Sequence, residues 1–262
     1  MTAAAAARKM MGGMIETPFG VQVNAFSKPA AAGFSVTGHT PTAGFQHRID
    51  LRGPAGRLEA VLNQGSPQAT FAALVCHPHP LGGGSMHNKV VYHAMKVMNA
   101  REWGFRAPVL RFNFRGAGLS HGRHDGAAEK DDVAAALAWL ESAFRLPIVA
   151  AGFSFGAAMT LDACCGGSPA QIDIRALALL GLPIEAEGRN YSYPCLGACK
   201  IPKLFLSGER DPFAPSARLR DLAAGAAEPK RLVLIPGADH FFSGQMNAMQ
   251  NALAAWLKEQ MQ

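Results

Sequence analysis

A serine flanked by glycines stands at a predicted strand-to-helix boundary. Residues 152–156 read Gly-Phe-Ser-Phe-Gly, between the apolar run 147–153 and the alanine-rich segment 157–165. A sharp turn of this kind exposes a serine hydroxyl beside a base, and the glycines let neighbouring backbone approach without a Cβ clash. Ser154 is therefore the candidate nucleophile.

The same five-residue pattern occurs a second time, at residues 118–122. This Gly-Leu-Ser-His-Gly segment lies in a stretch rich in Gly, His, Arg and Asp, with no apolar run before it. Without a strand and a helix around it, nothing would hold the hydroxyl at the edge of a sheet. We interpret Ser120 as a loop serine.

An acid and a base follow two strands that lie later in the chain. Asp211 comes after the predicted strand 203–207, and His240 comes after the predicted strand 231–235. Sites in open parallel sheets form at the carboxyl ends of strands, so both side chains are expected near Ser154. His240 would act as general base, and Asp211 would orient its imidazole.

Two other acids lie close enough to be rivals for the role of Asp211. Glu209 precedes it in the same loop, and Asp239 adjoins the base. Because a side chain folds back onto its immediate neighbour with difficulty, Asp239 is a poor partner for His240. We interpret both rivals as turn residues.

The elements that must position these residues alternate along the chain. Strands are expected at 46–51, 57–63, 70–76, 108–114, 147–153, 176–182, 203–207 and 231–235. Helices are expected at 86–103, at 129–144, after Ser154, at 216–226 and at 246–261. Strands separated by helices build a parallel sheet, and the first two form an antiparallel hairpin at its edge. The pattern predicts an α/β fold with a mostly parallel, eight-stranded, doubly wound sheet.

Length and composition fit one catalytic domain. The chain has 262 residues, of which 49% are hydrophobic, enough for a single large core. Residues 1–45 are rich in Ala, Gly, Pro, Ser and Thr, and we expect a loosely docked or disordered extension there. The domain is expected to span residues 46–262.

Charge and hydropathy exclude several classes of function. The net charge of +6 is scattered rather than gathered in a basic helix, so nucleic acid is not an expected partner. No run approaches the ~20 apolar residues of a membrane span. At the start of the chain, apolar residues precede Arg8 and Lys9, the reverse of a secretory signal, which predicts a cytoplasmic protein.

Cysteines and histidines give no convincing metal site. The five cysteines are an odd set, which favours reduced thiols. Cys195 and Cys199 lack a second ligand pair nearby, and no third ligand matches His77 and His79. We expect no metal, and we expect the two histidine rings to hold their loop by hydrogen bonds.

Three segments carry a resemblance to a known family. They are Cys-His-Pro-His-Pro-Leu-Gly-Gly-Gly-Ser-Met-His-Asn-Lys-Val-Val at 76–91, Arg-Phe-Asn-Phe-Arg-Gly-Ala-Gly-Leu-Ser at 111–120, and Gly-Phe-Ser-Phe-Gly-Ala at 152–157. With the Asp211 and His240 segments, they make residues 46–262 resemble the α/β-hydrolase superfamily. The likeness is closer to its compact bacterial serine hydrolases, which are related to dienelactone-hydrolase-like proteins. It implies the α/β-hydrolase fold, with helices on both faces of the sheet.

The resemblance also implies an oxyanion hole made from two backbone N–H groups. One is the N–H of Phe155, immediately after the nucleophile. The loop of the second donor reads His-Pro-His-Pro instead of the usual His-Gly. Since Pro78 and Pro80 have no N–H, the donor is either His79 or Leu81, and His79 is preferred.

The implied activity is hydrolysis of small carboxylic esters or thioesters through an acyl-enzyme, without a cofactor. About twenty residues, 183–202, separate the sixth strand from the seventh, too few for a cap domain. A small-molecule acyl substrate would enter an open site beside Tyr191 and Tyr193. Alternatives are a catalytically silent binding module, or an acyltransferase or perhydrolase that uses the same three residues.

Overall fold

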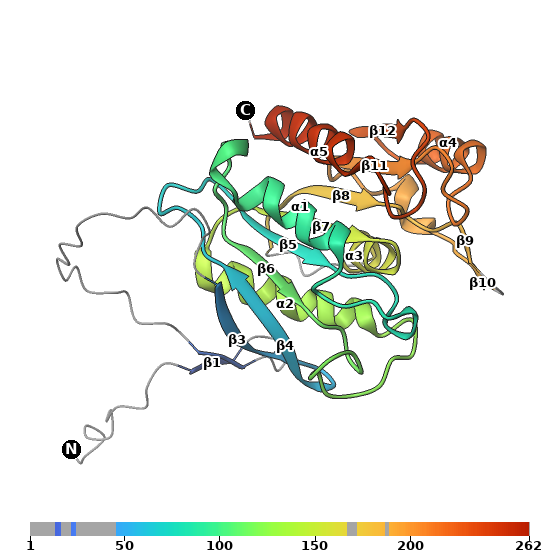
Figure 1. The fold of residues 1–262 in the computed structure, drawn as a ribbon. Helices are drawn as coiled ribbons and strands as arrows, with labels where there is room; N and C mark the ends of the chain where they lie inside the picture. Colours follow the sequence, from blue (N-terminus) through green and yellow to red (C-terminus); the bar gives the residue numbers. More distant parts are fainter. Residues whose placement is uncertain (1–13, 17–21, 25–45, 167–171, 187–188, 262) are drawn as a thin grey trace, which may run out of the picture.

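One eight-stranded sheet forms the centre of the molecule in the computed structural model, which describes residues 14–16, 22–24, 46–166, 172–186 and 189–261 (Figure 1). The strands are β3 (Gln46–Gly53), β4 (Gly56–Asn63), β5 (Ala72–Cys76), β6 (Val109–Phe112), β7 (Ile148–Phe153), β8 (Ile174–Leu180), β11 (Lys203–Gly208) and β12 (Lys230–Ile235). Their order across the sheet is β12-β11-β8-β7-β5-β6-β4-β3. The six strands from β12 to β6 run parallel, and the hairpin of β3 and β4 joins β6 antiparallel. The predicted fold class and edge hairpin are confirmed.

Helices cover both faces of the sheet (Figure 1). α1 (Lys89–Asn99) and α5 (Met246–Gln260) pack on one face with the apolar residues of β5, β7, β8 and β11 that point toward them. α2 (Glu129–Phe144) and α3 (Phe155–Cys165) pack on the other face, where α4 (Ser216–Gly225) adds Leu219 and Ala223. The two core layers arise because side chains on a strand alternate between the faces of the sheet.

The predicted helix 86–103 is wrong in its bounds, because local signals end it on both sides. At the start, the Asn88 side chain accepts a hydrogen bond from the N–H of Val90, which makes Asn88 the N-cap of α1. At the end, Ala100 is extended, and a separate 3-10 turn, η2 (Arg101–Trp103), follows. The regular helix therefore covers only 89–99.

The described residues of the connection between β8 and β11 form no cap domain. Its described residues form two short paired strands, β9 (Glu185–Ala186) and β10 (Arg189–Asn190), and the 3-10 turn η3 (Pro194–Gly197). This connection starts at the carboxyl end of β8, where β9 lies (Figure 1), and runs back to the amino end of β11. The connection is short, in agreement with the expectation that the fold has no large cap domain.

The predicted extension at 1–45 falls mostly outside the described residues. Two three-residue strands within it, β1 (Met14–Glu16) and β2 (Gln22–Asn24), pair antiparallel. In the described part of the chain, no helix combines the length and apolar character needed to cross a membrane.

Candidate active site

Ser154 lies in a strained turn between strand β7 and helix α3. Its φ of 55° and ψ of −122° are unusual for a residue with a Cβ, a conformation that costs ~1–3 kcal/mol. The Ser154 N–H donates to the carbonyl of Leu180 in β8 at 2.8 Å, and its carbonyl accepts from the N–H of Ala157 at 2.8 Å. These bonds hold the turn, which carries the hydroxyl at the carboxyl edge of the sheet.

The two glycines of the turn are required by close backbone contacts. A Cβ on Gly152 would lie 2.3 Å from the carbonyl oxygen of Gly156. A Cβ on Gly156 would lie 2.5 Å from the carbonyl oxygen of His77. Any side chain at either position would push the first turn of α3 away from β5 and β7.

The structure brings the three candidate residues into one hydrogen-bonded line. The Nδ1 of His240 lies 2.7 Å from Oδ2 of Asp211, and its Nε2 lies 2.9 Å from Oγ of Ser154. Because the carboxylate only accepts, Nδ1 carries the ring proton and Nε2 is left to accept from the serine hydroxyl. Asp211 is 2% exposed and His240 3%, so water competes little for these bonds.

Two further donors hold the Asp211 carboxylate. Its Oδ1 accepts the backbone N–H of Phe213 at 2.9 Å, and its Oδ2 accepts the Ser207 hydroxyl at 2.9 Å. Sequence reasoning missed Ser207. The feature of the sequence that could have indicated it is a single hydroxyl after the apolar residues Leu204–Leu206 of β11.

Aromatic rings surround the imidazole of His240. The ring centroids of Phe153, Phe213 and Phe241 lie 4.9, 4.6 and 5.2 Å from it. Phe153 is fully buried, whereas Phe241 is 52% exposed and borders the site from the solvent side. The base is thus packed in apolar surroundings, which strengthens its hydrogen bonds to Asp211 and Ser154.

Both rival acids accept backbone N–H groups: Asp239 closes its own turn, whereas Glu209 links its loop to the loop after β12. Glu209 accepts the backbone N–H of Gly237 through Oε2 at 2.9 Å. The Asp239 carboxylate accepts the N–H groups of Phe241 and Ser243, and these bonds lower its pKa. Among the described contacts, the ring of His240 is hydrogen-bonded to Asp211 and to neither rival.

Ser120 is a structural serine, as interpreted from the sequence. Its hydroxyl donates to the carbonyl of Asn113 at 2.6 Å and accepts the N–H of Glu59 at 2.9 Å. The side chain therefore ties the 116–122 loop to strand β4 and to the end of β6.

His77 holds its loop through both ring nitrogens. Nδ1 donates to the carbonyl of Pro78 at 2.6 Å, and Nε2 accepts the N–H of Phe114 at 2.9 Å. Burial lowers its pKa to about 4, which keeps the imidazole neutral. No group of three metal-ligating side chains occurs in the described residues.

His79 and Leu81, the two candidates for second oxyanion donor, differ in their surroundings. The ring of His79 packs against Phe155, with centroids 5.0 Å apart, and against His124 at 4.5 Å. Leu81 lies in the 3-10 turn η1 (Pro80–Gly82), and its side chain is 77% exposed. Phe155 is the first residue of α3, where N–H groups have no partner within the helix. Of the two, His79 is the residue whose ring packs on Phe155, the candidate for the first donor.

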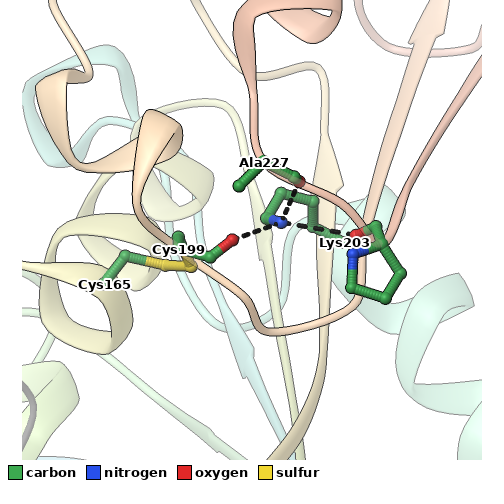
Figure 2. Close-up of a disulfide and its surroundings, with 5 residues drawn as sticks. Cys165, Cys199, Lys203 and Ala227 are labelled. Carbon is green, nitrogen blue, oxygen red and sulfur yellow. Dashed lines mark hydrogen bonds between the residues drawn. A yellow bond between two sulfur atoms is a disulfide. The ribbon is translucent and has the colours of Figure 1, made fainter.

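The expectation that all thiols are reduced is wrong for two cysteines. Cys165, at the end of α3, forms a disulfide with Cys199, which follows η3 (Figure 2). The residues are 34 positions apart, and the fold brings their Cα atoms to 5.4 Å, a proximity that sequence spacing does not reveal. Cys76, Cys164 and Cys195 are free, and burial raises the pKa of Cys76 to about 12. A cytoplasmic location stays a prediction.

A buried lysine fastens the same segment to the sheet. Lys203, at the start of β11, donates through Nζ to the carbonyls of Cys199 at 2.7 Å, Ala227 at 2.8 Å and Pro229 at 3.3 Å (Figure 2). Burial lowers its pKa. Three backbone oxygens thus replace the water that the ammonium loses, and the 183–202 connection is fixed near its end.

Residues 72–260 match the family described as the alpha/beta hydrolase domain. The chain belongs to the alpha/beta hydrolase family. An uncharacterized protein of Rickettsia prowazekii is 32% identical over 218 residues, which are 80% of this chain and 88% of that protein. The family match takes in the segments of Ser154, Asp211 and His240 and leaves residues 1–71 outside.

Two solved alpha/beta hydrolase structures are similar to this chain. An alpha-beta serine hydrolase homologue from Coxiella burnetii has a TM-score of 0.69 and 29% identity, covering 84% of this chain and 100% of that one. A serine hydrolase without a lid from Xanthomonas campestris has a TM-score of 0.71 and 29% identity, covering 84% and 96%. The resemblance to compact serine hydrolases that lack a cap is confirmed.

Proposed function

We propose that this protein is a serine hydrolase that cleaves small carboxylic esters or thioesters through an acyl-enzyme on Ser154. The observation that carries the proposal is the hydrogen-bonded line of Ser154, His240 and Asp211, with distances of 2.9 and 2.7 Å. A serine hydroxyl becomes a nucleophile when a correctly oriented base accepts its proton. Similarity to serine hydrolases of known structure supports the proposal that this protein is a serine hydrolase.

Acylation begins when the Ser154 oxygen attacks the carbonyl carbon and its proton passes to Nε2 of His240. The carbonyl π electrons move to oxygen, and the resulting oxyanion accepts hydrogen bonds from the N–H groups of Phe155 and His79. Collapse of this intermediate expels the alcohol or thiol, which takes the proton from His240. Asp211 stays ionised and stabilises the imidazolium throughout.

Deacylation repeats these steps with water. His240 removes a proton from the water that attacks the acyl carbon, then returns it to the Ser154 oxygen as the acid product leaves. All protons are carried by His240, substrate and water, so no cofactor takes part. The short 183–202 connection supports an open site, which would suit small or protruding acyl groups of small molecules.

Covalent labelling with a fluorophosphonate tests the proposal. The wild type is compared with folded Ser154→Ala and Ser120→Ala variants, and the labelled residue is located by intact mass and peptide mapping. We expect one label per chain at Ser154, lost only in Ser154→Ala. For an ester that the wild type cleaves, Ser154→Ala should lower kcat/KM by about 10⁴-fold or more.

Other outcomes separate the alternatives. A folded wild type that resists the probe contradicts the proposal and favours a binding module on the same fold. If the wild type is labelled, an ester and a thioester that share one acyl group are compared. Their kcat/KM values show which of the two bonds the protein cleaves faster. Products formed with added alcohol or hydrogen peroxide identify acyl transfer or perhydrolysis.

A further inference from the structure

We propose that Ser207 is a positioning residue that acts on His240 through the Asp211 carboxylate. This inference rests on the proposed function, because it assigns a fourth member to the same hydrogen-bonded line. Ser207 does not touch the reacting atoms. It fixes the orientation and the charge of the acid that sets the tautomer of the base.

The contacts of Asp211 support this role. Both Ser207 Oγ, at 2.9 Å, and His240 Nδ1, at 2.7 Å, donate to the same oxygen, Oδ2. The other oxygen, Oδ1, accepts the N–H of Phe213 at 2.9 Å. With one donor on Oδ1 and two on Oδ2, rotation of the carboxylate about its Cβ–Cγ bond would break hydrogen bonds on both sides.

Ser207 is buried, so its hydroxyl needs a hydrogen-bond partner within the protein, and the Asp211 carboxylate is that partner. Ser207 is 0% exposed and lies in β11, between β8 and β12 in the sheet. The preceding residues of the strand, Leu204, Phe205 and Leu206, belong to the core. A buried hydroxyl costs free energy unless it is hydrogen-bonded, and here its proton goes to a carboxylate, which is a strong acceptor.

Ser207 also affects the charge that His240 experiences. The positive end of the hydroxyl dipole points at Asp211 and offsets part of its negative potential. Removing the hydroxyl makes the surroundings of His240 more negative, which favours the imidazolium form. The acid limb of the pH–rate profile should therefore move to higher pH, a change that a purely structural role would not produce.

The test compares Ser207→Ala, which removes the donor, with Ser207→Thr, which keeps it. A matched control is Thr160→Val, which removes a hydroxyl that is equally buried in α3 and that lies outside the line. Rates of fluorophosphonate labelling and of p-nitrophenyl acetate hydrolysis are measured across pH. We expect Ser207→Ala to lower both rates by about tenfold and to shift the acid limb upward, while Ser207→Thr and Thr160→Val keep the wild-type limb.

A folded Ser207→Ala variant with wild-type rates and an unmoved acid limb would overturn the inference. If Ser207→Ala does not fold, Ser207→Cys, a weaker donor, should show an intermediate rate and shift, and wild-type behaviour would contradict the role. The NMR signal of the His240 Nδ1 proton gives a readout without turnover. A changed signal in Ser207→Ala supports the positioning even if the wild type resists the probe, and an unchanged signal argues against it.

Discussion

His77 is a buried imidazole that must stay neutral for the loop before α1 to keep its shape. Nδ1 donates to the carbonyl of Pro78, and Nε2 accepts the N–H of Phe114. Protonation of Nε2 would make it a donor that faces the N–H of Phe114, and this hydrogen bond would be lost. Burial lowers the pKa of His77 from 6.5 to about 4 in the folded protein. Because the same loop carries residue 79 to its place beside Phe155, the protonation state of His77 bears on the site as well as on stability.

This pKa difference predicts an acid-dependent loss of stability. Between pH 6.5 and about pH 4, the unfolded chain binds a proton at His77 that the folded protein does not. The free energy of unfolding should therefore fall by about 3 kcal/mol as the pH drops through this window, in addition to contributions from other groups. Urea unfolding near pH 7 and near pH 4 measures the change.

Two glutamine variants isolate the contribution of this residue. His77→Gln, which does not titrate, should show a smaller loss between the two pH values than the wild type. His87→Gln removes an exposed histidine and should behave as the wild type does. Equal losses in the wild type and His77→Gln would show that His77 does not contribute.

The site residues that could be predicted from sequence are those that follow strands. Ser154, Asp211 and His240 each come shortly after a predicted strand, and parallel strands bring such positions to one edge. Ser207 and the contact of Cys165 with Cys199 could not be predicted in this way. The first depends on the side-chain conformation of Asp211, and the second depends on how the 183–202 connection folds back onto α3.

At the scale of elements, the 183–202 connection is coupled to the site through Phe213. The carbonyl of Phe213 accepts N–H groups from Ile184 and Glu185, while its own N–H donates to Asp211 and its ring packs on His240. The far end of the connection is fastened by the disulfide of Cys199 and by Lys203 (Figure 2). The first end of the connection thus contributes to the framework around the base, whereas the far end is fixed to the end of α3 and the start of β11.

Removing the disulfide should destabilise the protein measurably. The cross-link closes a loop with a sequence separation of 34, for which chain entropy gives about 3–4 kcal/mol. Cys199→Ser should lower the free energy of unfolding by about this amount, measured by urea unfolding without reductant. Cys195→Ser, which alters a free cysteine in the same segment, should have a small effect.

A reductant provides an independent check on the disulfide. It should lower the stability of the wild type toward that of Cys199→Ser and leave the variant unchanged. If the wild type is insensitive to reduction and Cys199→Ser is as stable as Cys195→Ser, the cross-link does not contribute in solution.

The bounds of helices and strands can be predicted where the apolar periodicity and the capping residues indicate the same ends. They are predicted less well where the two signals differ. Helix α2 has the predicted bounds, 129–144, because its apolar face and acidic first turn lie between clear loops. Helix α1 was predicted too long because the apolar pattern continues into η2, whereas Asn88 and Ala100 set its real ends. Short strands such as β9 and β10 have too few residues to give a periodic signal.

At the scale of the whole molecule, the three residues of the proposed line and the complete sheet lie within 46–262. We therefore predict that a variant starting at Gln46 folds and is labelled by the fluorophosphonate at the wild-type rate. Strand β3 is the edge of this sheet and carries exposed charges at Arg48, Asp50 and Arg52, which disfavour pairing with other chains.

Thermal unfolding, size-exclusion chromatography and labelling kinetics check this variant. A melting temperature close to that of the full chain, with one label at Ser154, would support a domain that begins at residue 46. Aggregation or loss of labelling would instead show that the first 45 residues are part of the folded unit.

The disulfide also has a consequence for proteolysis. A single cut of the chain anywhere between Cys165 and Cys199 would separate the segment that carries Ser154 from the one that carries Asp211 and His240. The S–S bond would nevertheless keep both pieces in one covalent molecule. Such a nicked protein would migrate as one band in a non-reducing gel and as two after reduction, and it could retain all three residues of the site.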